Sequence, residues 1–211
     1  LVCRDDVDPD RIGICGICGW GGFAINAAAI DARIRATVAV TMYDMNRVMA
    51  NGYFDAADSA SARNLLRQRF GEQRTADAKA GFAKPAGGVP EKLPESAPQF
   101  AKDYQAYYKT SRGFHPRSPN STDGYGDVSR LAIANSPILA YADEIERAVM
   151  VVHGEKAHSR YFGEAAFKKL KGDNKELVIV PDASHCDLYD GGGKNAIPFD
   201  RIEAFYKRYM K

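Results

Sequence analysis

Short apolar runs alternate with helical patterns near the beginning of this chain. Residues 11–17 follow Asp8-Pro9-Asp10 and are apolar and partly β-branched, which predicts a buried strand. Glycines come next, and the alanine-rich stretch 23–30 predicts a compact helix. Residues 35–42 predict a second buried strand. A strand, a tight glycine turn, a helix and another strand form a βαβ unit, so the sequence predicts a parallel sheet.

The same rhythm resumes in the last third of the chain. Residues 148–153 and 177–181 predict two further buried strands, and residues 161–170 predict a helix between them. A short loop containing His185 follows the last strand. The final helix is expected over residues 198–210, where helical spacing relates Phe199, Ile202, Phe205 and Tyr206. The expected fold is α/β, with a mostly parallel sheet and helices on both of its faces.

The middle of the chain has a different character. Residues 58–74 predict a helix, with Ser59 or Ser61 as its N-cap. The remainder combines loop and partly helical stretches, namely a proline- and glycine-rich segment, a tyrosine cluster and a polar segment (84–98, 103–108 and 112–126). Long connections of this kind are often lids or binding segments. We therefore expect core segments at 1–43 and 147–211, separated by a cap inserted at 44–146.

Composition and charge narrow the function classes. Of the 211 residues, 45% are hydrophobic and 27% are charged, and the formal net charge is +2. The basic residues are scattered among acidic ones and form no dense stripe, so no nucleic-acid partner is expected. No apolar run approaches the roughly 20 residues of a membrane span, so no membrane partner is expected. No signal peptide is visible, which favours a cytoplasmic protein.

The four cysteines, Cys3, Cys15, Cys18 and Cys186, do not form a metal-binding pattern. Cys15 and Cys18 make one C-x-x-C, but neither a second such pair nor a suitable histidine pair completes a zinc site. We expect reduced cysteines, one of them reactive, and no metal or organic cofactor.

One constellation carries nucleophilic chemistry. An acyl hydrolase needs an exposed nucleophile, a base beside it and donors for the oxyanion. Residues 16–22, Gly-Ile-Cys-Gly-Trp-Gly-Gly, stand between the first strand and helix, where a strained turn exposes a nucleophile. The helix N-terminus would favour the thiolate of Cys18. His185 follows the last strand, where this arrangement places its base.

These segments resemble the dienelactone-hydrolase-like branch of the α/β-hydrolase superfamily, and in particular bacterial hydrolases with an inserted cap. The resemblance is carried by residues 8–18, by Val-His-Gly-Glu-Lys-Ala-His-Ser at 152–159 and by Ser-His-Cys-Asp-Leu-Tyr-Asp-Gly at 184–191. It implies hydrolysis of a small-molecule ester, lactone or similar acyl substrate. By position, it implies Cys18 as nucleophile and His185 as base.

The chain departs from that pattern at the elbow and at the acid. A small residue is usual two positions after the nucleophile, where this chain has Trp20. In a shifted frame Trp20 itself would take the nucleophile position, and that frame predicts no acyl-enzyme chemistry. The family often has an aspartate where this chain has Ala157 or His158. Glu155 or Asp44 could supply the acid, or a Cys–His pair could work without one.

Three further residues are expected at the site. The backbone N–H near Gly19 would form part of the oxyanion hole, Trp20 would form a wall or plug of the pocket, and His158 would line it. The fold usually has strands before the elbow, so we expect a separate N-terminal fragment or a second copy to complete the sheet. The alternative function is a catalytically silent hydrolase fold that binds a small molecule or a partner chain.

Overall fold

The computed structural model describes residues 1–211. The chain divides into two compact units, which are described separately. The first unit contains residues 1–44 and 138–211, and the second contains residues 45–137. The boundaries expected from the sequence were at 43/44 and 146/147, so the second one falls later than the break seen in the structure.

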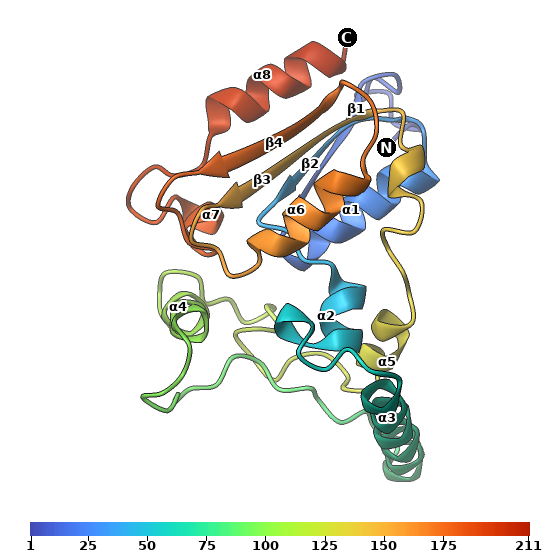
Figure 1. Cartoon of the computed structure of the whole chain (residues 1–211), viewed down its shortest axis with the longest axis vertical. Coiled ribbons are helices and arrows are strands. Elements are labelled where there is room, and N and C mark those ends of the chain that lie inside the picture. The colour runs from blue at the N-terminus through green and yellow to red at the C-terminus, as the bar shows by residue number, and fades with distance from the viewer. The chain divides into compact units, whose positions relative to one another are not determined.

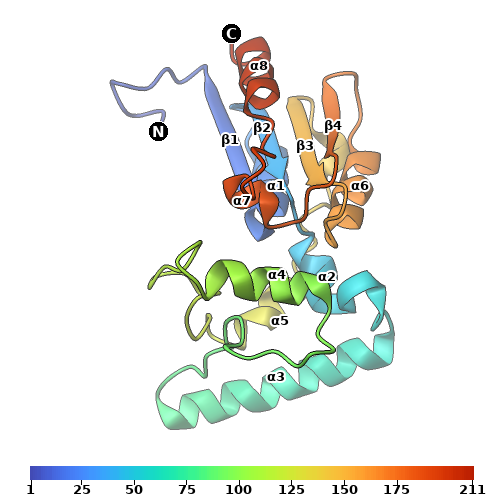
Figure 2. The ribbon, with the colours of Figure 1, turned by 90° about the vertical axis from the view of Figure 1, so that its left-hand side faces the viewer.

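The first unit is built on a four-stranded parallel sheet in the order β1-β2-β3-β4. Figures 1 and 2 show these strands side by side, with β1 and β4 at the two edges. The strands are β1 (Ile12–Ile17), β2 (Ile34–Val40), β3 (Ala148–Gly154) and β4 (Lys175–Val180). All four strands predicted from the sequence are present. Because the strands run parallel, their carboxyl ends lie at the same end of the sheet.

Helices cover both faces of the sheet, as expected (Figure 1). Right-handed crossovers place α1 (Gly19–Ile30) and α6 (Arg160–Lys169) on one face, because both connections advance along the sheet in the same direction. Helix α8 (Phe199–Tyr209) lies on the other face. Between α8 and the sheet is a core of apolar side chains that includes Val38, Val40, Met150, Val152, Leu188 and Phe205. Two short elements, η2 (Ala142–Glu144) and α7 (Asp187–Asp190), complete this unit.

The second unit is helical, with long connecting loops. Its longest helix is α3 (Ala60–Ala80), labelled in Figure 2. The side chain of Ser59 accepts a hydrogen bond from the N–H of Ala62 at 3.1 Å, so Ser59 is the N-cap of this helix. The other elements are α2 (Met45–Asn51), η1 (Tyr53–Asp55), α4 (Gln99–Tyr108) and α5 (Ser129–Ala134). No helix in either unit is both long enough and apolar enough to cross a membrane.

Candidate active site

Four residues with polar side chains follow the carboxyl ends of the four strands, and two of them, Cys18 and His185, were predicted from the sequence. Cys18 comes directly after β1, Thr41 directly after β2, Ser159 in the loop after β3, and His185 in the loop after β4. In a parallel sheet these ends lie at one edge, where open α/β folds bind their ligands. The fold of the first unit therefore places Cys18 and His185, two residues at which the sequence predicted chemistry, at the same end of the sheet.

The turn at Cys18 has a strained backbone. Its φ is 59° and its ψ is −129°, a conformation that a residue with a side chain rarely adopts. Such a residue costs on the order of 1–3 kcal/mol and persists only where its surroundings hold it. Here the N–H of Cys18 donates to the carbonyl of Val40, and the carbonyl of Cys18 accepts from the N–H groups of Gly21 and Tyr43, each at 3.0 Å.

Close backbone approaches around the turn explain its glycines. A Cβ on Gly16 would come within 3.0 Å of the carbonyl of Trp20, and a Cβ on Gly22 would come equally close to the carbonyl of Tyr43. The side chain of Trp20 itself is 74% exposed on α1, where its ring packs against Phe23 at 5.5 Å. The turn therefore accepts tryptophan two positions after Cys18, because that side chain points away from the crowded backbone.

Trp20 also has ordinary helical backbone within α1. The strained residue between the strand and the helix is Cys18. A nucleophile at position 20 would need the strained backbone at Trp20, whereas the structure has it two residues earlier, at Cys18.

His185 is buried and surrounded by hydroxyl groups. Only 2% of the residue is exposed. Its Nδ1 lies 2.6 Å from the Oγ of Ser159 and 2.9 Å from the Oγ1 of Thr41, and its Nε2 lies 2.8 Å from the hydroxyl of Tyr189. Thr41 is itself strained, with a φ of 43°, which is unusual for a β-branched residue.

Burial keeps His185 neutral. It lowers the pKa of His185 well below the usual value for histidine, and the nearby His158 and His153 lower it further. A neutral imidazole has one N–H donor and one acceptor nitrogen, whereas a hydroxyl can act as either. The three hydroxyls can therefore pair with either tautomer, and the tautomer decides which ring nitrogen is available as a base.

Tyr43 connects the turn to the histidines. Its backbone N–H bonds the carbonyl of Cys18, and its hydroxyl lies 2.5 Å from the Nε2 of His158. Its ring meets the ring of His185 edge-on, with centroids 5.4 Å apart. The rings of His158 and His185 have centroids 5.2 Å apart. Burial lowers the pKa of His158 to about 4, so it is neutral near pH 7.

The structure does not bring Glu155 to His185. The side chain of Glu155 is exposed, and its Oε2 accepts the backbone N–H of Asp182 at 3.0 Å. The residue of this loop that contacts the imidazole is Ser159, four residues after Glu155, and the sequence pattern did not indicate it. The proximity of Ser159 to a histidine has no signal in a single sequence. Asp44, the other candidate acid, is half-buried at the end of the first segment of this unit.

His153 lies near the end of β3 without a polar contact, because neither of its ring nitrogens has a hydrogen-bond partner. The ring is fully buried, and a Cβ on Gly163 would come within 3.0 Å of it. Burial lowers the pKa of His153 to about 3, so the ring packs as a neutral, largely apolar group.

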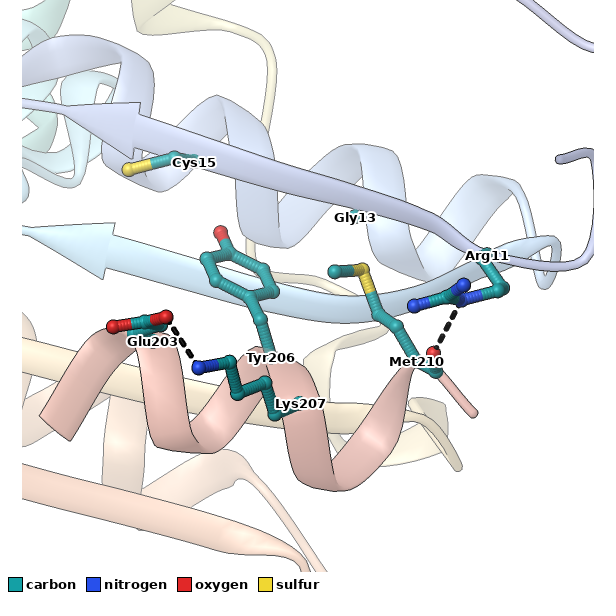
Figure 3. A pocket seen from close by; sticks show the side chains of 7 residues that line it. All are labelled: Arg11, Gly13, Cys15, Glu203, Tyr206, Lys207 and Met210. Carbon is teal, nitrogen blue, oxygen red and sulfur yellow. Dashed lines mark hydrogen bonds and ion pairs between the residues drawn. The ribbon is translucent and has the colours of Figure 1, made fainter. Parts of the chain in front are cut away.

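A groove of about 360 Å³ lies elsewhere, between β1 and α8 (Figure 3). It is lined by Arg11, Gly13, Cys15, Glu203, Tyr206, Lys207 and Met210. Figure 3 shows the ion pair between Glu203 and Lys207 and the 2.8 Å hydrogen bond from Arg11 to the carbonyl of Met210. None of the predicted site residues lines this groove. No group of three or more His, Cys, Asp or Glu side chains is arranged to hold a metal ion.

Known proteins resemble the chain along its whole length. The sequence matches no protein-family model. It is 46% identical over 207 residues to the uncharacterised protein PA2218 of Pseudomonas aeruginosa, an alignment that covers 97% of this chain and 54% of that protein. It is 27% identical over 212 residues to the uncharacterised protein YcjY of Escherichia coli, covering 100% of this chain and 68% of YcjY. The chain thus spans about half the length of PA2218.

Solved structures show the fold. The crystal structure of PA2218 superposes with a TM-score of 0.90 at 44% identity, covering 99% of this chain and 64% of that one. The α/β hydrolase GrgF from a Penicillium species superposes with a TM-score of 0.70 at 20% identity, covering 97% and 65%. The chain has the fold of the α/β-hydrolase superfamily, as the sequence predicted.

Proposed function

We propose that this protein hydrolyses a small-molecule ester, lactone or similar acyl bond, with Cys18 as nucleophile and His185 as base. The observation that carries the proposal is the strained turn at Cys18, between β1 and α1, with Tyr43 linking its carbonyl to the ring of His185. Strain of this kind concentrates at active sites, where it exposes a reacting group. The fold shared with GrgF, which is described as an α/β hydrolase, is consistent with this assignment.

The reaction has two balanced halves. In the first, the Sγ of Cys18 attacks the carbonyl carbon and its proton passes to His185, which then protonates the departing alcohol oxygen and leaves a thioester. In the second, His185 takes a proton from water, hydroxide attacks the thioester, and the returning proton regenerates the thiol. The first N–H groups of a helix have no acceptor within it, so the N–H of Gly19, the first residue of α1, would bind the oxyanion.

The proposed function also gives roles to the second unit, His158 and Trp20. The second unit, residues 45–137, would act as the cap and set the size of the substrate. His158 would line the pocket as a neutral imidazole, because burial lowers its pKa to about 4. Trp20, exposed on α1, would contribute to the pocket wall once substrate is bound. We assign the substrate class from the resemblance to the dienelactone-hydrolase-like branch.

One observation favours the alternative, a silent fold that binds a small molecule. The Nε2 of His185 lies 2.8 Å from the hydroxyl of Tyr189, so one ring nitrogen that could serve as a base is already engaged. A binding protein of this kind would hold its ligand without forming an acyl-enzyme.

The test is covalent labelling of Cys18. The purified full chain is treated with a β-lactone acylating probe, its intact mass is measured, and the modified residue is mapped. We expect one addition, at Cys18, that is lost in Cys18→Ser and falls at least tenfold in His185→Ala. Cys3→Ser is the matched control, because Cys3 is an exposed thiol at the chain's beginning and its loss should change nothing. A folded protein whose Cys18 resists both the probe and iodoacetamide would leave the binding function as the better account.

A further inference from the structure

Ser159 stands at the N-cap of a helix, but its side chain does not cap that helix. It precedes helix α6 as its N-cap residue, and an N-cap serine usually accepts a hydrogen bond from an N–H of the first helical turn. Its side chain makes no such capping bond. Instead its Oγ lies 2.6 Å from the Nδ1 of His185. A serine that gives up its capping bond for a contact with a histidine indicates a functional role, because departures from local preferences concentrate at functional sites.

The environment of this contact makes it strong. Ser159 has no exposed surface, and His185 is almost completely buried. Hydrogen bonds between such groups are not weakened by competing water, and leaving a buried ring N–H without an acceptor is costly. The backbone of Ser159 is held in place, because its carbonyl accepts the N–H of Phe162 at 3.0 Å. The second hydroxyl at Nδ1, that of Thr41, is farther away at 2.9 Å.

We infer that Ser159 is a positioning residue that occupies the place of the fold's acid, accepting the Nδ1–H of His185 and thereby keeping Nε2 unprotonated, the state in which this nitrogen can act as the base. Ser159 stands in the loop after β3, the third strand of the sheet, where the sequence led us to look for a carboxylate. The role of the base rests on the proposed hydrolytic function, whereas the tautomer does not.

A hydroxyl in this position has a chemical consequence. It orients the imidazole but does not offset the charge of an imidazolium, as a carboxylate would. The titratable groups near His185 include His153 from β3, His158 from the following loop, Tyr43 after β2 and Tyr189 from α7. Burial lowers the pKa of His153 to about 3 and that of His158 to about 4, so neither ring is charged near pH 7. With no carboxylate at Nδ1, the imidazole of His185 should stay neutral until it takes a proton during attack on the carbonyl.

The experiment measures the tautomer directly. Nitrogen-15 NMR of the histidine side chains in the full chain distinguishes protonated from unprotonated ring nitrogens at His185. We expect Nδ1–H with an unprotonated Nε2 in the wild type, and a mixture of tautomers in Ser159→Ala. Thr41→Val, the matched control that removes the more distant hydroxyl, should keep the wild-type tautomer. A wild-type ring that carries its proton on Nε2, or an unchanged tautomer in Ser159→Ala, would overturn the inference.

Ser159→Asp provides a second and independent readout. A carboxylate at this position should raise the pKa of His185 and favour a thiolate–imidazolium pair, so iodoacetamide should alkylate Cys18 at pH 6 at least tenfold faster than in the wild type. No acceleration in a folded variant would count against the positioning role. If the tautomer shifts as expected while no variant is ever acylated, the hydrolytic function fails and the role of Ser159 in fixing the ring stands.

Discussion

The backbone carbonyl of Cys18 accepts a hydrogen bond from the backbone N–H of Tyr43 at 3.0 Å. This bond joins the turn after β1 to the segment after β2. The side chain of Tyr43 extends the link, because its hydroxyl contacts His158 at 2.5 Å and its ring packs on His185. Tyr43 therefore contacts both the strained backbone of Cys18 and the rings of the two histidines.

The hydroxyl of Tyr43 should contribute to stability. Tyr43→Phe keeps the backbone hydrogen bond and the ring, but leaves the partly buried Nε2 of His158 without the tyrosine hydroxyl. Losing one partner of a buried hydrogen bond costs about 1–3 kcal/mol. Urea denaturation should show a loss of this size in the free energy of unfolding. Tyr141→Phe, at a tyrosine that is 62% exposed, is the control and should be nearly neutral. Equal losses of unfolding free energy in the two variants would show that the contact with His158 does not stabilise the fold.

Gly16 should tolerate no side chain. In Gly16→Ala the new Cβ would come within 3.0 Å of the carbonyl of Trp20, so the start of α1 would have to move. Overpacking of this kind costs about 1–3 kcal/mol, and the same movement should disturb Cys18 and slow its alkylation. Gly71→Ala in α3 is the contrasting variant, because no atom lies within 4 Å of its added Cβ. It should be neutral or stabilising by up to about 1 kcal/mol, since alanine favours a helix interior. Equal stability of the two variants would contradict the crowding at the turn.

The buried histidines should make the fold sensitive to mild acid. The pKa of His153 falls to about 3 in the folded state, from a usual value of 6.5, and that of His185 is also strongly lowered. The unfolded chain then binds more protons below pH 6.5, so the free energy of unfolding rises with pH in that range and is lost as pH falls. The loss between pH 7 and pH 5 should be about 2 kcal/mol for each histidine that stays neutral.

Chemical denaturation at several pH values checks this dependence. His153→Leu removes one of the titrating rings. The slope of the unfolding free energy against pH should therefore be smaller by the contribution of one histidine. The absolute stability of the variant is not the relevant quantity, because the shape of the cavity also changes. An unchanged slope would mean that His153 takes up its proton in the folded state.

The hydroxyl of Tyr189 should restrain the base. It lies 2.8 Å from the Nε2 of His185, and in the tautomer inferred above it donates to that nitrogen. Tyr189→Phe removes the competing donor, so iodoacetamide should alkylate Cys18 several-fold faster at pH 7. The acceleration should vanish in a His185→Ala background, which separates an effect on the base from a general loosening of the loop. Slower alkylation in Tyr189→Phe would show instead that this hydroxyl holds the ring in its working position.

Much of the first unit could be predicted from local patterns. Each of the four strands is a short apolar run that must be buried, and α1 and α8 show helical composition or spacing, so these elements follow from residues close together in sequence. The second unit was less predictable. The short helices α2 and α5 lack a strong periodic pattern, and α4 was recognised only as a cluster of tyrosines.

The sequence by itself also determined where the chemistry gathers, because a cysteine in a glycine-rich strand-to-helix turn and a histidine after the last strand must both lie at the carboxyl edge of a parallel sheet. Only the tertiary structure decided what surrounds them. Ser159 reaches His185 across 26 positions of sequence and Thr41 across 144. Such contacts depend on how β2, β3 and β4 pack side by side. A local pattern can show that a side chain is near the active edge, but which polar group meets which ring nitrogen is set by long-range packing.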